Sequence, residues 1–165
     1  MSRCNDMDGF TLIELMITLV LLSIAAAIAI PSFGNLIRTN QLQAQAEEVK
    51  AFIQHARSEA VTGRAPAELS IASNSPWEIR RAGAVLRQLE HQAERATLAA
   101  MDGNGNALSS LFYYPSGTAS GMARFTICRD QEPADGYLIT VEPSGNIKLH
   151  PRGKDENNTP LGNCQ

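Results

Sequence analysis

The chain has 165 residues, with 14 basic and 17 acidic side chains that give a formal net charge of −3, and only 5% of its residues are aromatic. This length accommodates one modest globular domain of about 100 residues beside a membrane segment. The slightly acidic balance lacks the basic excess that marks nucleic-acid-binding domains, so composition gives no support to that class of protein.

An apolar segment, residues 10–30, follows a short polar leader, residues 1–9. As a helix, the segment would be about 31 Å long at 1.5 Å per residue, close to the roughly 30 Å thickness of a bilayer's hydrocarbon core. We therefore expect it to span a membrane once. An ordinary cleavable signal peptide is disfavoured: the three alanines at 25–27 would suit cleavage, but the leader sets two acids against a single Arg3 and is not positive.

Glu14 is the only charged residue in this apolar segment. A charge at the centre of a membrane helix costs about 2.5–3.5 kcal/mol on insertion scales, so such a residue usually has a function and a partner of opposite charge. No Lys or Arg within the segment supplies that partner. A plain membrane anchor with an incidental glutamate is the simpler alternative, and it leaves Glu14 without a role.

The residues around Glu14 carry a family resemblance. A polar leader, then Gly9, Phe10, a Thr-Leu-Ile run and Glu14 at the head of an apolar helix resemble the class III signal of type IV pilins and pseudopilins. In that family a membrane peptidase cuts after the glycine and methylates the new terminal amine, and the glutamate lies fifth in the mature chain. The resemblance implies cleavage between Gly9 and Phe10, N-methylation of Phe10 and an assembly role for Glu14.

The same resemblance implies how Glu14 would act. When the helices of neighbouring subunits stack with an axial offset, each Glu14 would meet the terminal amine of Phe10 in another subunit. Two opposite charges in an apolar bundle are tolerated only when they are paired. A subunit displaced along the axis would leave a carboxylate unpaired, so this contact would set the register of assembly and would not be catalytic.

Pro31 also matches the pilin pattern, in which a proline commonly lies part of the way along the membrane helix. Its ring leaves no N–H for the carbonyl of Ala27, and Ser32 and Gly34 follow closely. We therefore expect the helix to kink or loosen here and to continue beyond it.

Residues 31–63 are expected to form an amphipathic continuation of this helix. Small and apolar side chains recur at spacings of four and three, and polar side chains occupy the opposite side, so one face should pack against a domain. Gly63 and Pro66 should end the helix. The apolar stripe consists of Leu42, Ala46, Val49, Ile53, Ala56 and Ala60, and the polar side carries Gln43, Glu47, Lys50, Gln54 and Arg57.

Residues 64–165 change to short β-rich runs separated by Asn, Ser, Gly and Pro, which predicts a β-rich globular domain. Turns are expected at 102–106, 115–121 and 143–145. The Glu, Gln, Arg and Ala content of residues 86–100 allows a helix as an alternative to two strands. The predicted strands are 67–72, 77–82, 84–89, 96–100, 110–114, 124–128, 137–142 and 146–150.

Three cysteines occur, and Cys4 lies in the leader that cleavage would remove. The remaining pair, Cys128 and Cys164, suggests a disulfide if the domain is exported. It would close a loop of about 37 residues and stabilise the fold by about 4 kcal/mol in the chain-entropy model. Two free thiols are the alternative.

The second half of the chain resembles the C-terminal half of the GspH/FimT group, which holds minor pseudopilins of type II secretion and minor pilins of the FimT and FimU kind. The matching runs are LFYYPSG at 111–117, RFTIC at 124–128, YLITV at 137–141 and SGNIKL at 144–149, together with RSEAVTGR at 57–64. The paired cysteines favour the FimU-like minor pilins. The resemblance implies an α+β fold, the type IV pilin fold, in which a long N-terminal helix packs on an antiparallel β-sheet domain.

Enzyme chemistry finds no support in the sequence. His55, His91 and His150 are scattered without metal-ligand spacing. The run at 117–121 lacks the G-x-S-x-G spacing of a nucleophile elbow, and no phosphate-binding glycine pattern occurs. We expect no catalytic residue, no metal, no cofactor and no small-molecule substrate.

A local basic stretch, Lys148, Arg152 and Lys154, is the candidate patch for DNA or a protein partner. Some FimT-like proteins bind DNA through a G-R-x-R motif at this place. Here the aligned residues 145–148 read Gly-Asn-Ile-Lys, so the first arginine is absent, and two acids at 155–156 weaken the field that a phosphate backbone needs. DNA binding is therefore the disfavoured interpretation.

Together the resemblances imply a minor type IV pilin. It would enter the inner membrane as a single-pass prepilin with a periplasmic globular domain, and then join the pilus at the cell surface. Its partners would be the prepilin peptidase, the pilus assembly platform, other minor pilins and the major pilin, in support of twitching motility, adhesion or DNA uptake. The alternatives are a GspH-type minor pseudopilin of type II secretion, a FimT-like DNA receptor for transformation and a membrane-tethered hydrolase.

Overall fold

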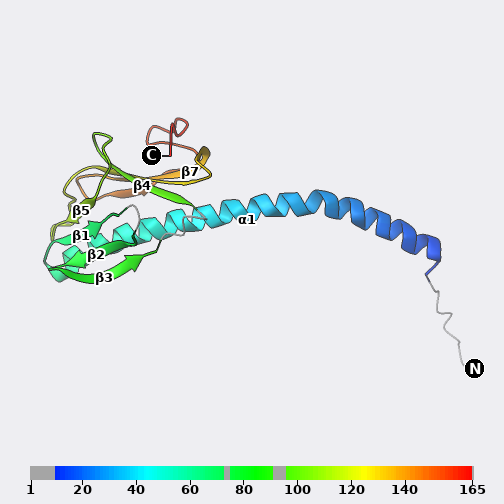
Figure 1. Cartoon of the computed structure of the whole chain (residues 1–165), viewed down its shortest axis with the longest axis horizontal. Coiled ribbons are helices and arrows are strands. Elements are labelled where there is room, and N and C mark those ends of the chain that lie inside the picture. The colour runs from blue at the N-terminus through cyan, green and yellow to red at the C-terminus, as the bar shows by residue number, and fades with distance from the viewer. Residues whose placement is uncertain (1–9, 73–74, 91–95, 165) are drawn as a thin grey trace, which may run out of the picture. The chain divides into compact units, whose positions relative to one another are not determined.

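The computed structural model of the chain describes residues 10–72, 75–90 and 96–164. These residues form one long helix and eight strands, and the chain divides into two compact units, residues 1–38 and 39–165 (Figure 1). Helix α1, Leu12–Gly63, contributes to both units and ends at the predicted Gly63.

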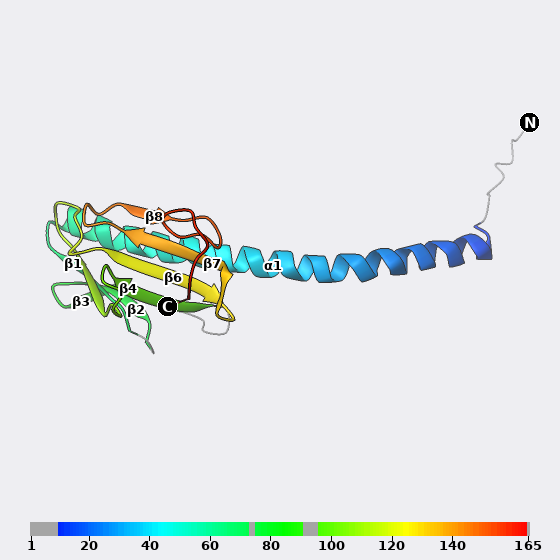
Figure 2. The same cartoon turned by 90° about the horizontal axis from the view of Figure 1, so that it is seen from above.

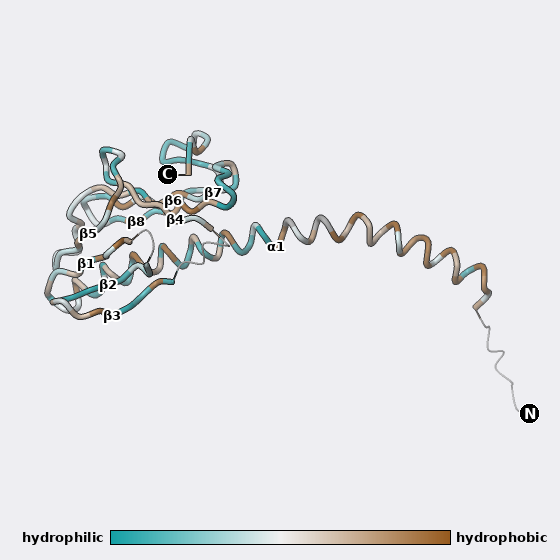
Figure 3. Tube along the Cα trace, viewed as in Figure 1, coloured by the Kyte–Doolittle hydropathy of each residue, from teal (hydrophilic) through white to brown (hydrophobic). Residues whose placement is uncertain are grey.

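The first unit consists of the N-terminal part of α1. Among the described residues, Leu12–Ile30 is the helical segment long and apolar enough to cross a bilayer, and none of its residues is buried. Figure 3 shows this part of α1 as a mostly hydrophobic stretch. The backbone is helical at Pro31, so α1 continues through the proline as expected, while the kink itself stays a prediction.

In the second unit, the remainder of α1 packs by one face. All six residues of the predicted apolar stripe are buried, and Phe52 is buried beside them. The polar side of the helix faces solvent, with Gln43, Glu47, Gln54 and Arg57 exposed. The amphipathic prediction is confirmed, because spacings of four and three place one continuous stripe along a 3.6-residue helix.

The first sheet has the strand order β3-β2-β1-β5, and every pair in it is antiparallel. Strand β1 is one of its two inner strands and pairs with β2, which follows it in sequence, and with β5, which lies about 40 residues away. The bounds are Ala67–Ser70 for β1, Trp77–Arg81 for β2, Ala84–Leu89 for β3 and Ser110–Tyr113 for β5.

The second sheet has the order β4-β6-β7-β8 and is also antiparallel throughout. Strand β7 is the longest of the eight described strands and pairs with β6 along most of its length, whereas β8 covers only its last three residues. The bounds are Thr97–Asp102 for β4, Ala123–Arg129 for β6, Glu132–Val141 for β7 and Ile147–Leu149 for β8.

The two sheets and the second part of α1 share one hydrophobic core. Trp77 on β2 and Phe125 on β6 are in contact across the sheets, with ring centroids 5.7 Å apart and planes tilted by 57°. Ile53 on the helix, Leu69 on β1 and Ile139 on β7 are fully buried in the same cluster. Figures 1 and 2 show the end of α1 lying along the two sheets.

The predicted α+β fold is confirmed, and each of the eight predicted strands has its counterpart. The strands form two sheets, because β3 and β4 are not paired with each other although they follow one another in the chain. The helical alternative for 86–100 is wrong in the described residues, since β3 runs to Leu89 and β4 starts at Thr97. The predicted turns at 102–106, 115–121 and 143–145 contain turn residues as expected.

Candidate assembly interface

The N-terminal end of α1 is organised around Thr11 and Glu14. The Thr11 Oγ1 atom accepts a hydrogen bond of 3.3 Å from the backbone N–H of Glu14, and the helix begins at Leu12. Thr11 is therefore the N-cap, and Thr-x-x-Glu is the sequence of a capping box. This local role was not predicted from the sequence, although the four-residue pattern was its signal. A negative charge in the first helical turn is also favoured by the helix dipole.

Glu14 has no cationic partner among the described residues. The other polar side chains of the apolar segment behave differently, because Thr18 donates a hydrogen bond to the Leu15 carbonyl at 2.8 Å and Ser23 donates one to the Val20 carbonyl at 2.7 Å. Hydroxyls bonded to their own helix can be buried at low cost, whereas an unpaired carboxylate cannot. In the described part of this segment, Glu14 is thus the side chain that requires a partner from outside the chain.

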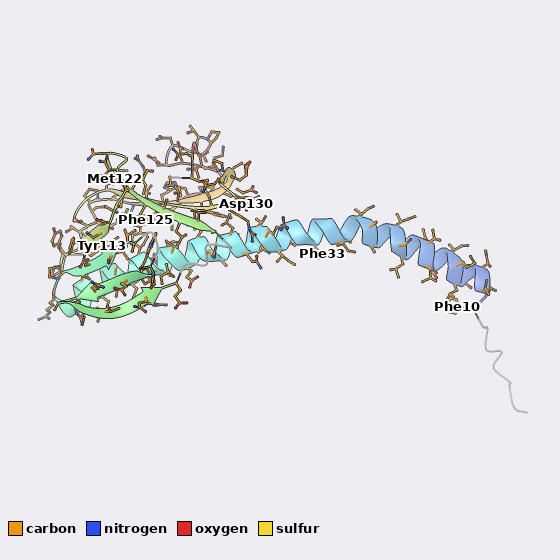
Figure 4. The ribbon with its side chains drawn as sticks, viewed as in Figure 1. Phe10, Phe33, Tyr113, Met122, Phe125 and Asp130 are labelled. Carbon is orange, nitrogen blue, oxygen red and sulfur yellow. A yellow bond between two sulfur atoms is a disulfide. The ribbon has the colours of Figure 1, made fainter. Side chains whose placement is uncertain are left out.

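The surface around Glu14 is apolar and open. Phe10 is 82% exposed, and Phe33 is exposed farther along α1; Figure 4 shows both projecting from the helix among other free side chains. A monomeric soluble protein rarely exposes a continuous apolar surface of this extent. The exposed apolar residues include Leu12, Ile13, Leu15, Met16, Ile17, Leu19, Val20, Leu21, Leu22, Ile24, Ile28, Ile30, Leu36 and Ile37.

Gly9, the first residue of the predicted cleavage site, lies outside the described residues, and so does Cys4. Phe10 is described and precedes the first turn of α1. Cleavage and N-methylation at this position therefore stay predictions from the sequence.

The predicted cysteine pair is joined in the second unit. Cys128 and Cys164 form a disulfide with their Cα atoms 5.8 Å apart, and both residues are buried. The bond fastens the C-terminal segment to strand β6. Gly136 on β7 makes room for it, because a Cβ atom there would lie 2.7 Å from the Cys128 sulfur.

Ion pairs hold the same C-terminal segment to the sheet, and one of them neutralises Arg152 in the candidate basic patch. Arg152 pairs with Asp135, and Glu156 pairs with Arg124 on β6. Lys148 is exposed on β8, and Lys154 is half-buried, with its backbone bridged to Pro160. The three predicted residues therefore do not present one unneutralised positive surface, which weakens the case for a phosphate-binding site.

His150 is buried between these basic residues. Its Nε2 atom lies 2.9 Å from the hydroxyl of Thr140, and burial, together with the charge of Lys148, lowers the pKa of the imidazole. His55 lies 3.7 Å from Glu59 on the same helix, and His91 is outside the described residues. Across the described ranges, no group of three His, Cys, Asp or Glu side chains is placed to hold a metal ion.

A groove of about 500 Å³ runs between the second part of α1 and the turn that precedes β8, and the sequence did not predict it. Arg57 on its helix wall donates a hydrogen bond of 2.9 Å to the carbonyl of Gly117. Gly145 packs so closely that a Cβ atom would lie 1.8 Å from the same carbonyl oxygen. Residues 145–148, which stand where the G-R-x-R motif would lie, thus lead from the turn into strand β8 beside this junction, and Asn146 and Ile147 line the groove.

Comparisons with known proteins agree with this geometry. The family model for the type II transport protein GspH matches residues 45–145, and the model for the prokaryotic N-terminal methylation motif matches residues 5–30. A search of curated proteins gives no significant match.

Two crystal structures of the type IV minor pilin FimU from Pseudomonas aeruginosa are similar to this chain. One has 26% identity and a TM-score of 0.59, covering 76% of this chain and 96% of that one; the other has 25% identity and a TM-score of 0.58, covering 74% and 99%. The minor pseudopilin EpsH of Vibrio cholerae has the same fold at 14% identity, with a TM-score of 0.54, covering 70% of this chain and 99% of that one.

Proposed function

We propose a function for this chain, which belongs to the GspH family and carries the prokaryotic N-terminal methylation motif. The function is that of a minor type IV pilin, a structural subunit that primes assembly of the pilus and is incorporated into it. The similarity to FimU supports this choice, because it extends over nearly all of that structure.

One observation carries the proposal: an apolar helix exposed along its length, with Glu14 unpaired near its start. In a bilayer the apolar surface is satisfied by lipid, but the carboxylate is not. In a bundle of similar helices both requirements are met, if each neighbour supplies a positive charge at the right height. We infer that this charge is the terminal amine of Phe10, freed by cleavage after Gly9 and belonging to an adjacent subunit.

The capping geometry of Glu14 is compatible with this role. The glutamate lies one turn from Phe10 along the chain, at the end of the helix where both groups would enter the filament core. A buried pair of this kind mainly enforces register, because removing one partner leaves the other as an uncompensated charge, at a cost of about 3–5 kcal/mol. Glu14 would thus reject subunits that are displaced along the axis.

The disulfide supports an extracytoplasmic second unit, since structural disulfides persist in oxidising compartments. We infer a prepilin inserted once in the inner membrane, with its globular domain in the periplasm, followed by transfer into a pilus at the cell surface. Its partners are the prepilin peptidase, the assembly platform, other minor pilins and the major pilin. We assign the chain no catalytic role and no cofactor.

A minor pseudopilin of type II secretion is the second candidate, because the GspH family includes that class and EpsH has the same fold. The two candidate functions predict different phenotypes. In a strain lacking this chain, a minor pilin predicts loss of surface pili and of twitching, with normal release of secreted enzymes. Loss of secretion with normal twitching would contradict the pilin assignment and establish the pseudopilin.

A further inference from the structure

The C-terminal segment contains an acceptor sequence for N-linked glycosylation that the assembly function does not use. Residues 157–159 read Asn-Asn-Thr, which fits the pattern Asn-x-Thr with x other than Pro. Asn157 is the only one of the chain's asparagines in this context. In exported proteins this pattern marks surface loops that carry a bulky, solubilising glycan.

The structure places this sequence at an exposed turn. The backbones of Lys154 and Pro160 are bridged, and the Asp155 N–H donates to the Thr159 carbonyl at 2.9 Å, so the residues between them form a tight loop. The side chains of residues 157–160 are all exposed. A glycan attached at Asn157 would therefore displace no core side chain.

The amide of Asn157 is free to react, whereas the threonine is engaged. Among the described residues, no hydrogen bond involves the Asn157 side chain. The Thr159 hydroxyl donates a 2.6 Å hydrogen bond to Asp155 Oδ2, and the Asn157 and Thr159 N–H groups donate to Asp155 Oδ1 at 2.9 and 2.8 Å. An enzyme that recognises the threonine hydroxyl has to replace its bond to Asp155, which is easiest before the segment docks and the disulfide to Cys164 closes.

We propose that Asn157 is an N-glycosylation site, modified on the external face of the membrane before the C-terminal segment is locked. The Asn157 Nδ2 atom forms a bond to C1 of the first sugar of a lipid-diphosphate-linked oligosaccharide. The bond between C1 and the diphosphate oxygen breaks, the lipid diphosphate leaves with the electron pair, and the amide gives up one proton to a base of the transferase. The proposal rests on the export inferred above.

The test uses the full chain, co-expressed in a bacterium with a bacterial oligosaccharyltransferase and its lipid-linked oligosaccharide. Mass spectrometry of the tryptic peptide that follows Lys154 should show a glycan on Asn157. Asn157→Gln and Thr159→Ala should abolish it, while Thr159→Ser and Asn158→Gly, which keep the acceptor pattern, should retain it. Cys164→Ser, which removes the covalent link between the segment and β6, should raise the modified fraction.

The state of the disulfide shows whether a negative result concerns the proposed glycosylation site or the export of the domain. An oxidised chain without glycan, while a control acceptor protein in the same cells is modified, would overturn the proposed site and leave export intact. A reduced, unmodified chain would overturn export and this inference with it. A modified fraction in Cys164→Ser no higher than in the unaltered chain would overturn the proposed order of events.

Discussion

The Nε atom of Arg57 donates a hydrogen bond of 2.9 Å to the carbonyl oxygen of Gly117. This contact ties the exposed side of α1 to the turn after β5, and Gly145 packs against the same carbonyl from the turn before β8. Three segments that are far apart in the sequence are thus fixed at one point. The groove beside it is shaped by this junction.

Arg57→Ala should lower the free energy of unfolding of the second unit by about 1–2 kcal/mol, because the carbonyl of Gly117 loses a charged donor at a partly buried site. Urea unfolding in detergent, followed by the fluorescence of the single tryptophan, Trp77, measures it. Trp77 is 2% exposed in the core and reports on both sheets. Lys50→Ala is the control: its exposed pair with Glu47 should contribute no more than about 0.5 kcal/mol. Equal effects of the two substitutions on the free energy of unfolding would contradict a stabilising role of the contact between Arg57 and Gly117.

Gly145→Ala should destabilise the domain more than Gly83→Ala. Both glycines have a φ of +82°, so a side chain costs about 1–2 kcal/mol at either position. A Cβ atom at residue 145 would also collide with the Gly117 oxygen at 1.8 Å, whereas nothing lies within 4 Å at residue 83. The same unfolding measurement should show a difference of at least about 1 kcal/mol between the variants. Identical losses of stability in the two variants would mean that the positive φ alone, and not the collision with Gly117, determines the cost.

Much of this fold was predictable because its signals are local. The stripe from Leu42 to Ala60 follows helical spacing, and turn residues bound each strand, so the positions of the elements could be deduced. The early start of β7 was not, because Pro133 and Gly136 interrupt the strand signal. The structure accommodates Pro133 where β8 does not reach, so that side of the strand needs no hydrogen-bond donor.

The pairing of the strands and the details of the candidate site depend on contacts distant in sequence. Nothing local indicates that β1 pairs with β5 or that β4 joins the other sheet. The pairing of Arg152 with Asp135 likewise follows from how the C-terminal segment docks, and no pattern around Arg152 predicts it. Glu14 was identified from sequence alone because a charge in an apolar run is itself the signal.

His150 should make the stability of the second unit depend on pH. Burial lowers the pKa of this imidazole from its ordinary value of 6.5, and Lys148 lowers it further, against smaller opposing effects of Glu156 and Asp155. The unfolded chain therefore binds the proton more readily. The stability contribution is present above the unfolded pKa and is lost as the pH falls below about 6.5 towards the folded pKa, by at most about 1.4 kcal/mol per pH unit.

Unfolding measured from pH 7.5 to 5 checks this dependence. His150→Gln should remove most of it. A profile that is unchanged by His150→Gln would assign the pH dependence to other groups.

Removing the disulfide should lower the free energy of unfolding by about 4 kcal/mol, because the reduced unfolded chain regains the freedom of a loop with a sequence separation of 36 residues. The double variant Cys128→Ser/Cys164→Ser measures this loss without leaving a free thiol. Cys4→Ser is the matched control and should have no effect on the mature protein. A loss below about 1 kcal/mol would show that the ion pairs of Arg124 and Arg152 hold the segment without the bond.

Incorporation of Glu14 variants into sheared filaments tests the central claim most directly. Both Glu14→Gln and Glu14→Ala retain the hydrogen bond from the backbone N–H of residue 14 to Thr11 Oγ1. Glu14→Gln removes only the charge, whereas Glu14→Ala also removes the side chain that completes the capping-box pattern. If Glu14 pairs with the amine of a neighbouring Phe10, both variants should be absent from filaments, while their second units stay folded and keep the Cys128–Cys164 disulfide. Normal incorporation of Glu14→Gln would show that assembly does not need the charge of Glu14, and would contradict the proposed assembly contact.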